Sequence, residues 1–226
     1  MVIGKGRMAR SLVDRVGDVE GRRIANCLGR KDNLKLIVEW KANVVIDFSS
    51  PAAILDYAPI CLFNRIPMVI GTTGHDQPQR KVILDCAEVI PVVFSSNYSE
   101  EMNLLFDIVA RAARILGATA TYGVDEIHHD QKKDAPSGSA KTLARIISKE
   151  TGKPLSEISM SSLRGGDVIG NHTVKLLGKG EILELTHRAS TRDTFANGAL
   201  KAADWVRGKS PGLYDMQDVL GLKVSK

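Results

Sequence analysis

The chain has 226 residues, 43% of them hydrophobic and 25% charged, with a formal net charge of +5. This size suits one large or two small domains. No apolar run approaches the ~20 residues that span a bilayer, and no signal-peptide pattern opens the chain, so we expect no membrane contact. The positive charge is spread out, which disfavours nucleic acid and suits small anionic ligands. Three widely spaced cysteines, Cys27, Cys61 and Cys86, indicate reduced core residues of a cytoplasmic protein.

The first hundred residues alternate short apolar runs with helical patterns. We expect five strands, at Met1–Ile3, Arg23–Leu28, Val44–Phe48, Met68–Ile70 and Ile90–Phe94. Helices are expected over Arg7–Val16, from Ser50-Pro51 onward and over Lys81–Glu88, with Ser50 as N-cap. Strands and helices in alternation imply parallel strands joined by right-handed crossovers.

After Asn97 the pattern becomes that of an α+β domain with a mixed sheet. The expected strands are Thr119–His128, Ile158–Leu163, His172–Leu177 and Ile182–His187, and the expected helices are Asn103–Leu116, Ala140–Glu150 and Thr194–Arg207. We therefore predict an α/β protein with a Rossmann-like nucleotide domain over residues 1–97. A second domain would follow over 98–207, and the tail, 208–226, would return to the first domain.

Four short segments lie where parallel strands end, which is where such sheets bind ligands. Gly4-Lys5-Gly6-Arg7-Met8 opens a helix, so its backbone can approach a pyrophosphate, although tight turns need glycine anyway. Leu28-Gly29-Arg30-Lys31 has no acid at the strand tip and two cations that suit a 2′-phosphate; a solvated loop explains it equally well. Gly71-Thr72-Thr73-Gly74 and Ser95-Ser96-Asn97-Tyr98 are either ligand loops or plain turns.

The segment Glu126–Ala140 concentrates histidine, lysine and aspartate in a loop that leads into a helix. This density of ionisable groups indicates a working site, because such groups are costly to bury. Ser137-Gly138-Ser139 supplies backbone N–H groups at the helix start, an arrangement that binds carboxylates. Metal ligation by His128 and His129 is the rival interpretation, but the spacing of zinc-binding helices is missing and we expect no metal.

Together these segments resemble the 4-hydroxy-tetrahydrodipicolinate reductase family. Glu126–Ala140 is similar to that family's signature E-x-H-H-x-x-K-x-D-A-P-S-G-T-A. Further similar stretches follow the family's order, namely Val45–Phe48, Gly71–Gly74, Arg164–Asp167, Thr186–Ala189 and Phe195–Gly198. The resemblance covers nearly the whole chain. It implies reduction of 4-hydroxy-tetrahydrodipicolinate to tetrahydrodipicolinate by NADPH or NADH, in diaminopimelate and lysine biosynthesis, by a cytoplasmic homotetramer.

The same resemblance implies roles for individual residues. His128 would be the acid/base group and Lys132 the proton donor. The dicarboxylate substrate would be held by His129, Lys132, Ser137, Gly138 and Ser139. The nicotinamide dinucleotide would be lined by Gly4, Lys5, Gly6, Arg7, Met8, Arg30, Gly71, Thr72, Thr73, Ser95, Ser96, Asn97 and Tyr98.

The chain departs from the family pattern in four places. Ser139 stands where the family usually has threonine, the glycine turn is one residue shorter, and only about sixteen residues separate Arg30 from Asp47. Glu100-Glu101-Met102 replaces smaller apolar residues. Two alternatives stay open, another nicotinamide-dependent reductase of amino-acid metabolism and a nucleotide sensor that has lost catalysis. The presence of both His128 and Lys132 argues against the sensor.

Overall fold

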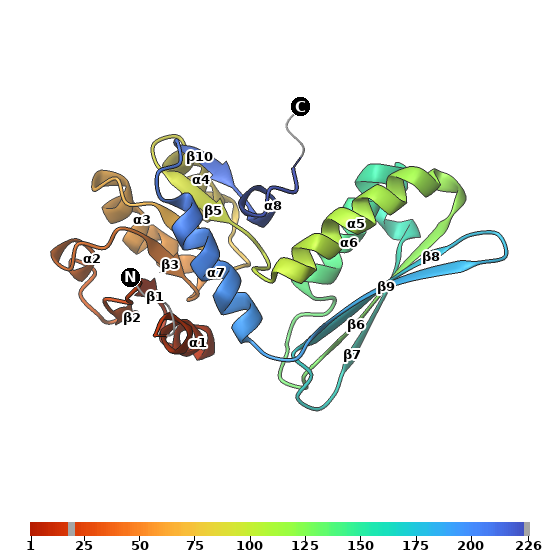
Figure 1. Cartoon of the computed structure of the whole chain (residues 1–226), viewed down its shortest axis with the longest axis horizontal. Helices are drawn as coiled ribbons and strands as arrows, with labels where there is room; N and C mark the ends of the chain where they lie inside the picture. Colours follow the sequence, from red (N-terminus) through yellow and green to blue (C-terminus); the bar gives the residue numbers. More distant parts are fainter. Residues whose placement is uncertain (18–20, 224–226) are drawn as a thin grey trace. The chain divides into compact units, whose positions relative to one another are not determined.

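The structure, a computed structural model, describes residues 1–17 and 21–223. The chain divides into two units, coloured along the sequence in Figure 1. Unit 1 contains Met1–Glu100 and Asp193–Lys226, and unit 2 contains Glu101–Arg192. None of the helices formed by the described residues is long and apolar enough to cross a membrane.

Unit 1 is built on a six-stranded sheet in the order β10-β5-β4-β3-β1-β2, in which every pair is parallel. The strands are β1 (Val2–Ile3), β2 (Cys27–Leu28), β3 (Val45–Asp47), β4 (Met68–Ile70), β5 (Pro91–Phe94) and β10 (Gly212–Tyr214). The chain runs from β1 to β2 on one side and then to β3 on the other side of β1. Ligands of open α/β sheets bind at such a reversal, outside the carboxyl ends of the strands.

Helices cover both faces of this sheet, because successive strand residues point to opposite sides. Val2, Ile46 and Val69 pack against α1 (Arg7–Val16), α7 (Asp193–Val206) and α8 (Met216–Val219). The alternate residues Ile3, Val45 and Met68 pack against the second group of helices, α2 (Leu36–Glu39), α3 (Ile54–Phe63) and α4 (Gln77–Ala87). A 3₁₀ turn at Pro51–Ala53 leads into α3.

The place of α7 differs from the sequence-based prediction, which put this helix in the second domain. It belongs to unit 1, where Ala196, Ala199 and Leu200 join the core of the first sheet. The backbone of Gly198 approaches the carbonyl oxygen of Tyr98 so closely that a Cβ would lie 1.7 Å from it. The small residues of α7 therefore let it pack tightly in unit 1. β10, from the tail, then pairs with β5.

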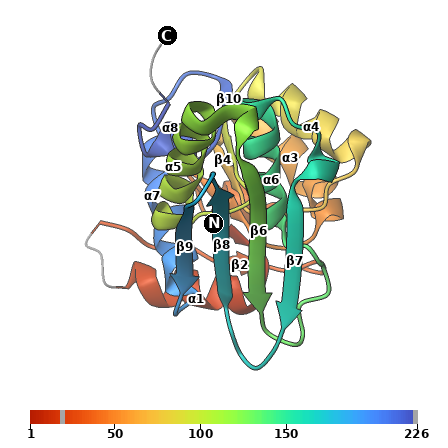
Figure 2. The ribbon, with the colours of Figure 1, turned by 90° about the vertical axis from the view of Figure 1, so that its right-hand side faces the viewer.

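Unit 2 is an α+β unit on a mixed four-stranded sheet in the order β7-β6-β8-β9, whose strands lie side by side in Figure 2. The strands are β6 (Thr121–His128), β7 (Ser159–Arg164), β8 (Gly170–Leu177) and β9 (Ile182–Ala189). β6 pairs with β7 in parallel, and the other two pairs are antiparallel. Two helices, α5 (Glu100–Leu116) and α6 (Gly138–Thr151), bury their apolar faces against Tyr122, Val124 and Val174.

The predicted fold class is confirmed, but the prediction lacked the short elements α2, β10 and α8, and several predicted elements differ at their ends. The strand expected over Arg23–Leu28 is confined to Cys27–Leu28. α4 begins four residues before Lys81. A reciprocal capping box fixes this start, between the N-cap Asp76 and Gln79 in the first turn. The remaining short 3₁₀ turns are Gly117–Thr119 and Leu155–Glu157.

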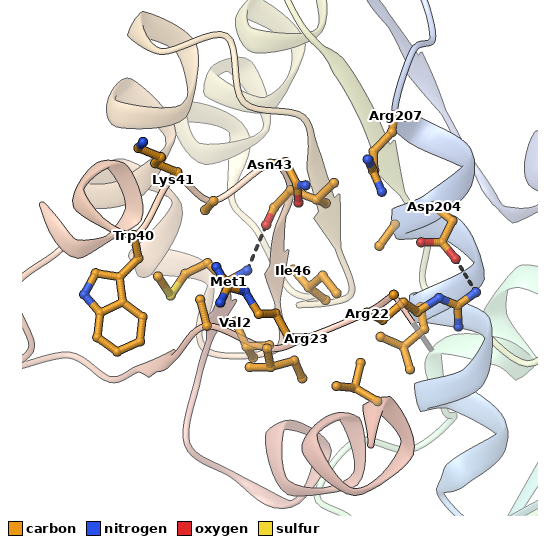
Figure 3. A pocket seen from close by; sticks show the side chains of 18 residues that line it. Met1, Val2, Arg22, Arg23, Trp40, Lys41, Asn43, Ile46, Asp204 and Arg207 are labelled. Atoms are coloured by element: carbon orange, nitrogen blue, oxygen red, sulfur yellow. Dashed lines mark hydrogen bonds and ion pairs between the residues drawn. The ribbon is translucent and has the colours of Figure 1, made fainter. Parts of the chain in front are cut away.

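A cavity of about 430 Å³ opens in unit 1 at the amino ends of the strands (Figure 3). It is lined by segments that precede β2 and β3 and by the end of α7, where Arg22 pairs with Asp204. This cavity therefore lies at the opposite end of the sheet from the loops that follow the carboxyl ends of the strands. It is therefore not the place where a parallel sheet of this kind holds a dinucleotide.

Candidate active site

The glycine turn after β1 has a backbone that only glycine fits. Gly4 has a φ of +124°, and a Cβ there would lie 2.4 Å from the carbonyl oxygen of Phe48 after β3. Its N–H donates to the carbonyl oxygen of Leu28, which ties the turn to β2. Gly6 precedes α1 without a side-chain cap, so the first N–H groups of this helix face outward for an anion. The turn therefore has the form of a pyrophosphate cradle.

The loop after β2 holds an acid that the sequence-based prediction did not single out. The Oδ2 atom of Asp32 accepts the N–H of Gly29 at 2.7 Å and lies 2.6 Å from Nζ of Lys5. The hydrogen bond from Lys5 lowers the pKa of Asp32. Arg30 and Lys31 are exposed beside it. The loop thus combines an acid suited to ribose hydroxyls with two cations suited to a 2′-phosphate.

The loops after β3 and β4 are locked together. The hydroxyl oxygen of Thr72 accepts the N–H of Ser49 at 2.8 Å, and a Cβ on Gly71 would lie 2.1 Å from the Phe48 ring. Buried Asp47 accepts hydrogen bonds from the hydroxyls of Ser49 and Tyr57, and its burial raises its pKa. Thr73 stays exposed at the tip of the β4 loop.

The loop after β5 is a tight turn with one residue directed into the core. The hydroxyl of Ser95 donates to the carbonyl oxygen of Asn97, and Ser96 is exposed. Tyr98 is only 2% exposed, and its hydroxyl lies 3.0 Å from the carbonyl oxygen of Ile70. The Tyr98 side chain therefore faces the core, whereas the sequence suggested a ligand-lining residue. The other strand-end residues proposed for the dinucleotide lie at the carboxyl edge of the sheet.

In unit 2 a buried carboxylate organises the end of β6. Glu126 is 1% exposed and accepts a fork of two hydrogen bonds, both 2.8 Å, from the guanidinium of Arg164 on β7. It also accepts the N–H of Ser137 at 3.1 Å and bonds to Nδ1 of His128. Burial opposes its charge, but the bonds from Arg164 and His128 prevail and lower the pKa of Glu126 to about 2.

His128 is oriented by that carboxylate. Because ionised Glu126 only accepts, Nδ1 of His128 carries a proton, and Nε2 is the nitrogen left for chemistry. A Cβ on Gly170 would lie 3.0 Å from this Nε2, so glycine on β8 leaves room for the ring. Burial lowers the pKa of His128 and outweighs the opposing effect of Glu126. The lowered pKa makes the protonated ring a stronger acid.

Arg164 also holds the loop after β6. Its guanidinium donates to the backbone oxygens of Asp134 and Lys132, at 2.5 and 3.3 Å. The Nζ atom of Lys132 lies 2.7 Å from a carboxylate oxygen of Asp134. His129 donates its N–H to the carbonyl oxygen of Val168, which fixes the loop on its other side. Lys132 is thus placed by its backbone while its ammonium group is held at the surface.

The sequence predicts an anion cradle at the start of α6, where the structure has a capped helix start. Ser137 is the N-cap, and its Oγ accepts the N–H of Ala140 at 3.2 Å. Gly138 is exposed, and a Cβ there would meet nothing within 4 Å. Gly138 lies in the first turn, where backbone N–H groups have no acceptor within the helix, and buried Ser139 follows it. His172, on β8, contacts Ser137 with its Nε2 at 3.0 Å.

Three residues of this constellation were not assigned roles from the sequence, namely Glu126, Arg164 and His172. Glu126 lies two residues before His128, a spacing that puts both on one face of a strand. Among the described residues, no group of three or more histidines, cysteines, aspartates and glutamates is arranged to hold a metal ion.

Unit 1 has a parallel sheet with a turn of the pyrophosphate-binding type. Unit 2 has a histidine oriented by a carboxylate, beside a helix start suited to anions. These features together are typical of a dinucleotide-dependent oxidoreductase. Family models confirm this class and sharpen it. Residues 1–98 match "Dihydrodipicolinate reductase, N-terminus" and residues 101–220 match "Dihydrodipicolinate reductase, C-terminus". The chain belongs to the dihydrodipicolinate reductase family.

Two curated relatives that are similar over most of the chain are both named 4-hydroxy-tetrahydrodipicolinate reductase. The protein from Akkermansia muciniphila is 48% identical over 199 residues, which cover 80% of this chain and 81% of that one. The protein from Geobacter sulfurreducens is 38% identical over 239 residues and covers 96% and 89%. The family and the reductase reaction predicted from the sequence are confirmed.

Solved structures show the same fold. A dipicolinate-bound dihydrodipicolinate reductase from Paenisporosarcina sp. TG-14 superposes with a TM-score of 0.78 at 23% identity, and covers 96% of this chain and 97% of that chain. A diaminopimelate dehydrogenase from C. glutamicum has a TM-score of 0.57 at 11% identity, with coverage of 99% and 95%. The fold, a parallel-sheet unit together with an α+β unit, is therefore shared with these solved structures.

Proposed function

We propose that this chain reduces 4-hydroxy-tetrahydrodipicolinate to tetrahydrodipicolinate with NADPH or NADH, and that the reaction uses the Glu126–His128 pair and the start of α6. The observation that carries this assignment is that Glu126 contacts both the acid/base ring and the cradle, through Nδ1 of His128 and the N–H of Ser137. One carboxylate thus fixes the group that moves a proton and the group that binds an anion. A reductase of a cyclic dicarboxylate needs both.

The proposed roles follow from charge development. When bound, the nicotinamide supplies a hydride to the unsaturated ring of the substrate. Negative charge then grows on the conjugated system, and a proton must arrive there. Nε2 of His128 and Nζ of Lys132 are the two groups of this site that can supply it. The substrate carboxylates would lie on Ser137, Gly138 and Ser139, with His129 and Lys132 beside them.

The dinucleotide would occupy the strand-end loops of unit 1. The fit rests on Gly4, whose missing Cβ leaves the turn free, and on the uncapped start of α1. Pyrophosphate would face Gly4, Lys5, Gly6, Arg7 and Met8, and the adenosine ribose would face Arg30 and Asp32. The backbone and exposed side chains of the later loops would hold the nicotinamide, at Gly71, Thr72, Thr73, Ser95, Ser96, Asn97 and the backbone of Tyr98.

The direct test is cofactor oxidation with freshly made substrate. We expect loss of absorbance from NADPH or NADH only when the substrate is present. Oxidation with other amino-acid precursors, and none with this substrate, would favour a different reductase on the same fold. Cofactor binding without any oxidation would favour a nucleotide sensor.

From the loop after β2 we predict that the enzyme uses NADPH and that Arg30 binds its 2′-phosphate. A 2′-phosphate gains charge-assisted hydrogen bonds from an exposed guanidinium, whereas NADH uses Asp32. Arg30→Ala is expected to lower kcat/KM with NADPH by about tenfold, the value of one such interaction, and to leave NADH nearly unchanged. Lys149→Ala, an exposed change at the end of α6, is the control. A strong NADH preference that Arg30→Ala does not alter would contradict this assignment.

We further propose that the second sheet carries homotetramer contacts. The face of the sheet that points away from α5 and α6 bears Leu163, 58% exposed, and Ile182, 62% exposed. The same face carries the Asp125–Lys175 ion pair, so these apolar side chains are part of a mixed surface, and exposed apolar side chains on a sheet are typically covered in an assembly. Sedimentation at micromolar concentration should show a tetramer, and the double substitution Leu163→Glu, Ile182→Glu should shift it to smaller species. Ile115→Glu, on exposed α5, should not. A monomeric wild type would exclude this arrangement.

A further inference from the structure

His172 is a buried histidine that lies against the substrate cradle. In the antiparallel register of β6 and β8 it stands opposite Glu126, and therefore on the same face of the sheet. The next residues on that face of β8, Val174 and Leu176, are core residues. His172 itself is 4% exposed, and its ring packs edge-on against His128 with centroids 5.1 Å apart. A polar ring in this position requires an explanation beyond packing.

The hydrogen bonds around this ring fix which nitrogen carries the proton. Nε2 lies 3.0 Å from Oγ of Ser137, and Nδ1 is buried with no hydrogen-bond partner among the described residues. Within the described chain Nδ1 lacks a partner in either tautomer, and a buried N–H without an acceptor is rarer than a buried acceptor without a donor, so the proton belongs on Nε2. A proton on Nε2 is used at once, because Ser137 accepts it. Burial, with the nearby His128, lowers the pKa of His172 to about 3, so the ring is uncharged.

With Nε2 of His172 as a donor, the Ser137 hydroxyl can form a further hydrogen bond only by donating its own proton. Its oxygen accepts the N–H of Ala140 as helix N-cap and the Nε2–H of His172, which occupies both lone pairs. The hydroxyl proton remains. Ser137 is 2% exposed, so this proton can reach an acceptor only where a ligand sits directly on the start of α6, next to exposed Gly138. The reverse tautomer would turn this proton inward, toward His172.

We propose that His172 is a positioning residue for the substrate, which holds the Ser137 hydroxyl so that its proton points to a substrate carboxylate. The inference rests on the proposed function, which places that carboxylate on Ser137–Ser139. His172 acts through Ser137 and does not itself touch the reacting atoms. Its removal should therefore weaken dicarboxylate binding and leave proton delivery by His128 and Lys132 in place.

The test is calorimetric binding of a planar pyridine dicarboxylate to the enzyme–NADH complex. His172→Leu, which keeps the bulk and removes the donor, is expected to raise Kd by about tenfold, the loss of one charge-assisted hydrogen bond. His172→Gln should restore most of the affinity, because its amide N–H reaches the position of Nε2. His172→Asn, whose amide is too short, should resemble His172→Leu. KM should rise in the same order, while the pH profile of kcat stays unchanged.

A double-mutant cycle separates positioning from general damage. Ser137→Ala should also raise Kd about tenfold, and Ser137→Ala with His172→Leu should be no worse than either change alone, because both remove the same hydrogen bond. Val174→Ala, the neighbouring core residue on the same face, should lower Tm without changing Kd. Additive losses, equal binding by the Gln and Asn variants, or normal Kd in His172→Leu would overturn the proposal. A wild type that does not bind the dicarboxylate would instead contradict the proposed function.

Discussion

Replacement of His128 by alanine should lower kcat by about 10²–10⁴-fold, the range typical of a lost general acid or base. The structure supports a role in the chemical step, because Nδ1 of His128 is held by Glu126 and Nε2 is the free nitrogen. Glu126 is in turn held by the Arg164 fork, so the ring is oriented before any ligand arrives. KM should change far less than kcat.

The measurement is steady-state kinetics with separate binding titrations of cofactor and dicarboxylate. Both Kd values should stay close to those of the wild type, because His128 is not part of the cradle. Lys133→Ala is a matched control for this loop, since Lys133 is exposed and lies next to Lys132. Lys133→Ala should retain activity, whereas Lys132→Ala should be at least as severe as His128→Ala. Near-normal kcat in His128→Ala would remove this residue from the mechanism.

The sheet of unit 1 was accessible from the sequence because its strands are buried on both faces. β3 and β4 are short, entirely buried runs, apolar except for Asp47 at the end of β3, and parallel sheets are made of such runs. The placement of α7 was not accessible in the same way. A helical pattern of alanines shows which face is buried, but not which sheet covers it. The close approach of Gly198 to Tyr98, 100 residues earlier in the chain, decides that.

The residues of the candidate site also differ in how far the sequence could place them together. His128 and Ser137 lie in one continuous segment, so their residue types and spacing are enough to predict an acid/base group and an anion site. Arg164 and His172 reach Glu126 and Ser137 through the pairing of β7 and β8 with β6. Strand register is not readable from the residue types alone. Tyr98 shows the opposite error. It lies in a loop at the carboxyl end of a strand, where ligands usually bind, but its hydroxyl points into the core.

Gly138→Val should abolish binding of the dicarboxylate while the fold and the dinucleotide site remain intact. Gly138 is the first residue of α6, is exposed, and has no atom within 4 Å of the position of a Cβ. Its backbone does not lie in the left-handed region, so valine brings no strain there. The added methyl groups would therefore project into open space in front of the helix start. That space is where a carboxylate must come to reach the N–H groups of Gly138 and Ser139.

The result is read from two titrations on the same protein. Cofactor affinity, measured by calorimetry, should equal that of the wild type because the dinucleotide loops lie in unit 1. Binding of a planar pyridine dicarboxylate to the enzyme–cofactor complex should be lost in Gly138→Val and reduced in Gly138→Ala, whose single methyl group obstructs less. An unchanged Tm in both variants excludes unfolding as the cause. If Gly138→Val still binds the dicarboxylate normally, the substrate does not lie on the start of α6, and the cradle formed by Ser137, Gly138 and Ser139 serves only to cap the helix.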